Sequence, residues 1–118
     1  MFCLWKFSRT NGFYCMSKAA VLMMTHVMAM ELSKYGVTAV AVCPGHINTP
    51  LLRNSFVQRG AAEGKTVDEY FTEMEGTIPM GRLAEPEEVG ELVAFLCDDR
   101  SAYINGNGIL IAGGKVME

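Results

Sequence analysis

The sequence predicts an α/β protein built on a parallel sheet. Two short runs, residues 37–43 and 109–112, are almost continuously apolar and rich in β-branched side chains. Such runs are typical of strands that helices cover on both faces, as in parallel sheets. Each run also follows a stretch of helical composition, and this alternation favours a parallel arrangement. With 118 residues, of which 50% are hydrophobic and 19% charged, the chain has the composition of one folded domain and not of a disordered segment.

The first helix is predicted over residues 14–35, a stretch without proline or glycine that is rich in good helix formers. Gly36 follows it as the left-handed residue that commonly ends a helix. Residues 19–30 are apolar except for Thr25 and His26, so we expect this helix to be buried on more than one side. The apolar run is shorter than the roughly 20 residues that a membrane span needs, and we expect no membrane partner.

A long excursion with several glycines, residues 47–84, separates the first strand from the second clear helix. Within it, residues 67–74 predict a short helix. The second clear helix opens at Glu85 and Pro86, because proline suits the first helical position and the glutamates that follow favour the positive end of the helix dipole. We therefore expect a single partial domain, 1–118, in four parts: an atypical lead-in (1–11), a helix and buried strand (12–46), the excursion (47–84), and a helix with the last strand (85–118).

The charge and the cysteines narrow the range of partners and locations. The formal net charge is −3, from 10 basic and 13 acidic residues, without a basic stripe, so we expect no nucleic-acid partner. The four cysteines form no C-x-x-C pair, which favours a reduced protein of the cytoplasm. The first acidic residue is Glu31, and this basic, acid-poor start makes a mitochondrial location the alternative. Cys43 and His46 have C-x-x-H spacing without two further ligands, so we expect no metal site.

Tyr14 and Lys18 are the candidate catalytic residues. At positions i and i+4 of a helix they share one face, so the phenol and the ammonium project toward the same place. A nearby cation favours the phenolate form of a phenol, which suits a group that exchanges a proton with a carbonyl or alcohol oxygen. An exposed pair of this kind contributes only about 0.3–0.5 kcal/mol, so the effect requires a walled site of low effective dielectric.

Three further motifs follow this pair along the chain. They are PGHINT at residues 44–49, GRLAEPEEV at residues 81–89 and GILIAGG at residues 108–114. Together with Tyr14 and Lys18, and in this order, they closely resemble the short-chain dehydrogenase/reductase family over residues 12–114. The resemblance implies the C-terminal part of a Rossmann-type, doubly wound parallel sheet.

The same resemblance implies an NAD- or NADP-dependent oxidoreductase that interconverts a small-molecule alcohol and a carbonyl by hydride transfer. Tyr14 resembles the catalytic acid/base. Lys18 resembles the lysine that promotes its ionisation and holds the nicotinamide ribose, so both residues are also cofactor-binding candidates. The other cofactor-binding candidates lie in the loop after the first strand: Pro44, Gly45, Ile47 and Thr49. The excursion resembles the substrate-covering lid, and the helix at residues 14–35 resembles the one through which the family forms homo-oligomers.

The chain also departs from the family pattern. No glycine-rich turn lies between a strand and a helix in the sequence, so nothing here cradles a pyrophosphate. The family's catalytic serine precedes the tyrosine and has no good counterpart, because Ser8 lies too close to Tyr14 along the chain. We therefore expect the N-terminal nucleotide-binding half to be absent and the isolated chain to be inactive. The alternative is a non-catalytic truncated product or pseudoenzyme that serves as an oligomerisation or interaction module.

Overall fold

The computed structural model describes residues 12–115, and the predicted lead-in with Ser8 lies outside the described residues. The long helix α1 (Gly12–Leu32) continues into a 3-10 turn, η1 (Ser33–Tyr35), after which Gly36 is left-handed as predicted, with φ 74°. Strand β1 (Ala41–Pro44) leads to helices α2 (Pro50–Glu63) and α3 (Val67–Gly76). Helix α4 (Pro86–Leu96), a 3-10 turn η2 (Asp99–Ser101) and strand β2 (Gly108–Ile111) follow. The predicted order of helix, strand, excursion, helix and strand is confirmed.

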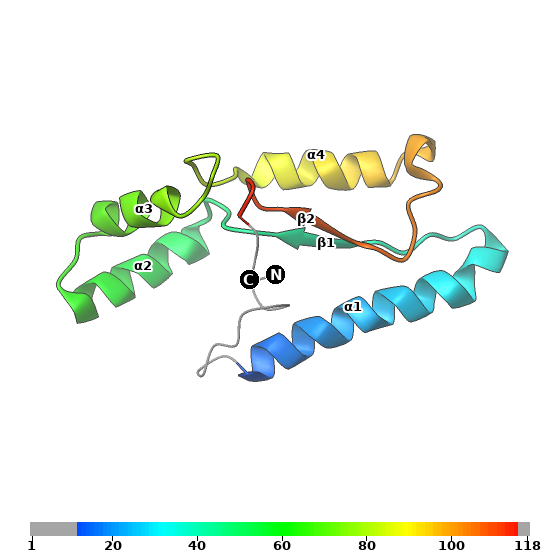
Figure 1. Ribbon diagram of the computed structural model, residues 1–118, viewed down its shortest axis with the longest axis horizontal. Coiled ribbons are helices and arrows are strands. Elements are labelled where there is room, and N and C mark those ends of the chain that lie inside the picture. Colours follow the sequence, from blue (N-terminus) through cyan, green and yellow to red (C-terminus); the bar gives the residue numbers. More distant parts are fainter. Residues whose placement is uncertain (1–11, 116–118) are drawn as a thin grey trace.

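The two strands form a parallel sheet, as predicted, with Ala41 opposite Gly108 and Pro44 opposite Ile111. Helices α1 and α4 lie on opposite sides of this sheet, and α2 and α3 extend beyond its carboxyl end (Figure 1). A Cβ added to Gly108 would lie 3.0 Å from Leu22 Cδ2, so the missing side chain lets α1 approach β2 closely. Because α1 runs antiparallel to the strands, its first turns lie near the carboxyl end of β1 (Figure 1).

Helix α1 is far less buried than its composition predicts. Its buried residues are Thr25 and Ala29, on one face of the helix. Met16, Met23 and Met30 recur every seven residues and are 67%, 62% and 82% exposed. The prediction of burial on several sides is wrong for the described chain, because a sheet of two strands covers only a narrow face of a helix. The helical segment Gly12–Tyr35 is long and apolar enough to cross a membrane by length and composition only, a test that core helices of soluble proteins and signal sequences also pass. The absence of a membrane partner stays a prediction.

Both strands are also less covered than predicted. Strand β1 alternates between buried and half-buried residues, whereas β2 alternates between exposed and half-buried ones. The first strand, predicted over residues 37–43, begins only at Ala41, whose backbone nitrogen donates to the Asn107 carbonyl at 2.9 Å. Among the described residues the sheet has two strands, so each of them pairs with a neighbouring strand on one side only.

Helix α2 lies inside the excursion and was not predicted from the sequence. Its local signals are a Thr-Pro pair, in which Thr49 is the N-cap and Pro50 occupies the first turn. The Thr49 hydroxyl accepts a hydrogen bond from the Leu52 nitrogen at 3.3 Å. Helix α3 was predicted over residues 67–74 and extends to Gly76.

Helices α2 and α3 form a hairpin with its own small core. Phe56 of α2 is 1% exposed and contacts the rings of Tyr70 and Phe71 on α3, with centroid distances of 5.7 and 5.1 Å. Gly60 permits the tight turn between the helices, since a Cβ there would lie 2.5 Å from the Lys65 carbonyl oxygen. The hairpin is therefore a compact unit that emerges directly from the loop after β1.

Candidate active site

Tyr14 and Lys18 lie side by side near the start of α1, as their spacing predicts. The Lys18 ammonium is 5.3 Å from the centroid of the Tyr14 ring, a distance at which a cation is attracted to an aromatic face. Tyr14 is 43% exposed, so the residue is partly open to solvent.

The Tyr14–Lys18 pair opens into a groove of about 280 Å³ between α1 and β1. Val21 and Thr25 continue the α1 wall, while residues 40–42 and Pro44 form the β1 wall. Ligands of parallel α/β proteins bind at the carboxyl ends of the strands. The groove meets this requirement, because its Tyr14 end lies beside the end of β1.

Gly45 begins the loop that leaves β1. Its nitrogen donates to the Ile111 carbonyl at 2.8 Å, which extends the parallel pairing by one residue past Pro44. A Cβ at position 45 would lie only 2.8 Å from the Ala112 Cβ. Glycine is therefore required here by the close approach of two backbone segments.

The rest of the loop is held by the segment before α4. Ile47 forms a parallel bridge with Ala84, the Asn48 nitrogen donates to the Ala84 carbonyl at 2.8 Å, and the Ala84 nitrogen donates to the His46 carbonyl at 3.1 Å. Thr49 ends the loop as the cap of α2. Of the predicted cofactor-binding loop residues, Pro44 lines the Tyr14–Lys18 groove, whereas Gly45, Ile47 and Thr49 do not line it.

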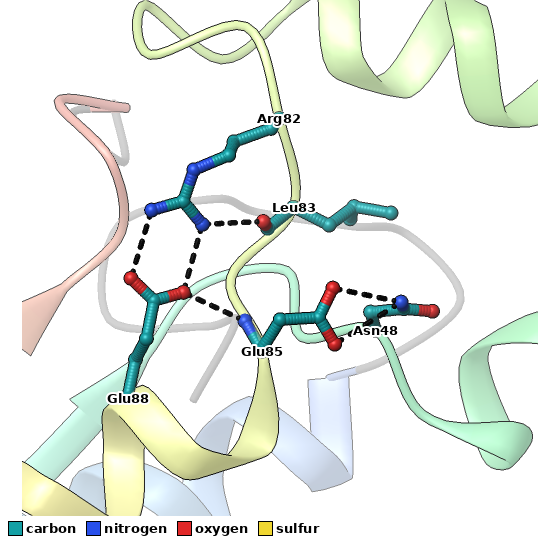
Figure 2. Close-up of polar contacts among 5 residues, drawn as sticks. All are labelled: Asn48, Arg82, Leu83, Glu85 and Glu88. Carbon is teal, nitrogen blue, oxygen red and sulfur yellow. Dashed lines mark hydrogen bonds and ion pairs between the residues drawn. The ribbon is translucent and has the colours of Figure 1, made fainter.

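A network of polar side chains surrounds the start of α4, which begins at Pro86 as predicted (Figure 2). Arg82 donates to both carboxylate oxygens of Glu88 at 2.8 Å. Glu88 also accepts from the Glu85 nitrogen at 2.8 Å, and the Glu85 carboxylate accepts from the Asn48 amide at 3.0 and 3.2 Å. The hydrogen bond from Arg82 and that from the Glu85 nitrogen lower the pKa of Glu88 from its ordinary value to about 2.

The roles of Asn48, Arg82 and Glu88 were not assigned from the sequence. The Glu85–Glu88 spacing of a capping box was a visible signal. The partners of Arg82 and Asn48 lie 6 and 37 residues away along the chain, and no spacing rule connects them.

The described residues offer no metal site: within 12–115 no three His, Cys, Asp or Glu side chains gather as ligands. Cys43 is buried in β1, and burial raises the pKa of its thiol. His46 is buried as well and lines a small cavity of about 70 Å³ together with Arg82 and Glu88. Cys43 and His46 are therefore both packed in the interior of the fold.

Comparison with known proteins decides the family. The family model described as enoyl-(acyl carrier protein) reductase matches residues 5–115. The chain belongs to the short-chain dehydrogenase/reductase family. The resemblance seen in the motifs is thereby confirmed, and the parallel sheet with its helices is part of a Rossmann-type fold.

Relatives and solved structures agree with this family. The chain is 39% identical over 104 residues to the oxidoreductase UcpA of Escherichia coli (88% of this chain, 38% of that protein). It is also 39% identical over 104 residues to human (3R)-3-hydroxyacyl-CoA dehydrogenase (88% of this chain, 36% of that protein). A short-chain dehydrogenase family protein from Francisella tularensis superimposes with a TM-score of 0.85 at 37% identity, over 89% of this chain and 43% of that one.

The L-sorbose reductase of Gluconobacter frateurii, solved with NADPH and L-sorbose, superimposes with a TM-score of 0.83 at 27% identity, over 91% of this chain and 41% of that one. The chain thus spans well under half the length of the relatives it matches.

Proposed function

We propose that the chain supplies the catalytic helix and the loop beside the nicotinamide in an NAD(P)-dependent oxidoreductase that interconverts a small alcohol and a carbonyl. The observation that carries the proposal is the Tyr14–Lys18 contact, 5.3 Å from ammonium to ring centroid, at the mouth of a groove beside the end of β1. Family membership and NADPH-bound neighbours support the reaction class.

In this reaction Tyr14 moves the proton. For carbonyl reduction its hydroxyl donates a proton to the substrate oxygen, and for alcohol oxidation its phenolate accepts one. The Lys18 ammonium lies beside the ring, where its positive charge stabilises the negative charge that develops on the phenolic oxygen during proton transfer. The bound nicotinamide supplies or accepts the hydride.

The described residues suit one end of such a cofactor. Lys18 offers hydrogen-bond donors for ribose hydroxyls, and the loop at residues 44–49 follows β1 at the edge where nucleotides bind in this class of fold. For the pyrophosphate, residues 12–115 contain no glycine-rich turn between a strand and a helix. We therefore propose that the chain acts together with a dinucleotide-binding segment.

A binding and activity assay tests this function. By calorimetry, the purified 118-residue chain is expected to show no saturable binding of NADH or NADPH. When joined to a dinucleotide-binding segment made of a strand, a glycine-rich turn and a helix, it is expected to oxidise NADPH or NADH with diacetyl or ethyl acetoacetate as probe. Micromolar, one-site binding by the chain alone would contradict the proposal that a separate dinucleotide-binding segment is needed to bind the cofactor. A joined protein that binds cofactor without turnover would contradict the catalytic role of this chain.

The alternative function is a non-catalytic module that associates through α1. The large exposed fractions of Met16, Met23 and Met30 favour it, because an apolar stripe on one face of a helix is typical of an interface. This alternative predicts self-association in solution and no gain of turnover in the joined protein. The enzyme proposal predicts both self-association and turnover, so the activity assay separates the two.

A further inference from the structure

Asn48 uses its whole side chain to connect two separate parts of the fold. Its amide nitrogen donates to both carboxylate oxygens of Glu85, at 3.0 and 3.2 Å. Its amide oxygen accepts from Arg53 Nε at 3.0 Å. Figure 2 shows the Glu85 side of this arrangement, in which the Asn48 amide faces the carboxylate.

These contacts connect the α2–α3 hairpin to the start of α4. Arg53 lies on α2, and its guanidinium is 4.7 Å from the centroid of the Phe71 ring on α3. On the other side, Glu85 is the N-cap of α4, and its nitrogen donates to Glu88, the partner of Arg82. A continuous path of contacts therefore runs from α3 through Asn48 to the ion pair beside α4.

Asn48 also occupies the point where the hairpin departs from the loop. Its backbone nitrogen donates to the Ala84 carbonyl at 2.8 Å, and the next residue, Thr49, caps α2. The hairpin core around Phe56 lies within α2 and α3, so it does not by itself orient the hairpin against the sheet. The polar contacts of Asn48 do provide such an orientation.

We propose that Asn48 is a positioning residue that fixes the α2–α3 hairpin relative to the loop at residues 44–49 through its paired contacts with Glu85 and Arg53. The catalytic meaning of this position rests on the proposed function and on the resemblance of residues 47–84 to a substrate-covering lid. The physical claim concerns the orientation of the hairpin and holds without any bound molecule.

Hydrogen exchange of the full 118-residue chain, followed by mass spectrometry of peptides, tests the claim. Asn48→Asp keeps the size and shape of the side chain but places a carboxylate against Glu85. We expect exchange about fivefold faster in α2 and α3, in proportion to the strength of exposed polar contacts, with unchanged exchange in β1, β2 and α4. Asn48→Asp loses the contact with Glu85 and keeps an acceptor for Arg53, whereas Asn48→Ala removes both contacts without adding charge and is expected to affect the same helices.

Two further variants make the result decisive. Asn54→Asp introduces the same charge at an exposed asparagine of α2 and is expected to leave exchange unchanged. Asn48→Asp combined with Glu85→Gln exchanges amide and carboxylate between the two positions, and is expected to restore the slow exchange of α2 and α3. Restoration is the sign of a specific contact, because a general loss of stability would not be repaired by a second substitution.

The proposal is overturned if Asn48→Asp leaves α2 and α3 unchanged, if it accelerates exchange equally in β1 and α4, or if Glu85→Gln fails to repair it. None of these outcomes depends on cofactor or substrate. Failure of the positioning role would leave the proposed function standing, and absence of turnover in the joined protein would leave the exchange result standing.

Discussion

Arg82 and Glu88 form a bidentate ion pair at the first turn of α4, in which Nη1 and Nη2 of Arg82 each lie 2.8 Å from a carboxylate oxygen of Glu88. Paired hydrogen bonds of this kind fix the mutual orientation of the two side chains as well as their distance. Arg82 also donates to the Leu83 carbonyl at 3.0 Å. The pair therefore orders the segment that holds the loop after β1.

Replacing Glu88 by glutamine should lower stability in a pH-dependent way. Glu88 has a folded-state pKa of about 2 and an ordinary value of 4.5, so its stabilising effect is present above pH 4.5 and is lost as pH falls toward 2. We expect Glu88→Gln to unfold a few degrees below the original chain at pH 7 and at nearly the same temperature at pH 2. Thermal unfolding by circular dichroism across this range measures the difference, and a gap that does not change with pH would contradict the assigned ion pair.

Two glycines should respond in opposite ways to alanine. Gly45→Ala places a Cβ 2.8 Å from that of Ala112 and should destabilise by about 1–3 kcal/mol through overpacking. Gly90 lies inside α4 with no atom within 4 Å of a built Cβ, so Gly90→Ala should stabilise by about 0.5–1 kcal/mol. Urea unfolding measures both. Adding Ala112→Gly should recover part of the Gly45→Ala loss, and equal effects at the two glycines would refute the packing argument.

Replacing Tyr14 by phenylalanine should remove turnover and spare cofactor binding. In the joined protein described above, Tyr14→Phe deletes the proton donor, and a loss of about 10²–10⁴-fold in kcat is expected. Tyr35→Phe is the matched control, because Lys34 lies 5.0 Å from that ring in a similar pair at the other end of the helical segment. Cofactor affinity, measured by nucleotide fluorescence, should stay within about twofold. Equal loss of affinity and turnover would show that Tyr14 is structural.

The chain should self-associate through the exposed stripe of α1. Burying each methionine of the stripe is worth about 1.5–3 kcal/mol, so Met23→Lys with Met30→Lys should shift the chain toward monomer in analytical ultracentrifugation. Leu51→Lys with Val57→Lys alters two exposed apolar residues of α2 and should not. A chain that is monomeric before any substitution would contradict this surface assignment.

Local chemistry made much of this fold predictable from the sequence. The first helical segment ends at Gly36 because that glycine is left-handed, and α4 begins at Pro86 because proline suits the first helical position. Both signals are properties of single residues and their neighbours. The side-by-side placement of Tyr14 and Lys18 follows from helical periodicity alone. The start of α2 is equally local, because it depends on Thr49 as the N-cap and on Pro50 in the first turn.

Only the tertiary structure determines which other parts of the chain these helices, strands and loops contact. The exposure of α1 depends on how much of the sheet lies against it. Neither the apolar sequence of residues 19–30 nor its periodicity specifies the area of that contact. The need for glycine at position 45 arises from Ala112, a neighbour in space from the other strand's end. Asn48, Glu85, Arg53 and the Arg82–Glu88 pair come together because the loop bridges to Ala84. Contacts between distant chain segments carry no periodic signal, so only the fold brings these side chains within hydrogen-bonding distance.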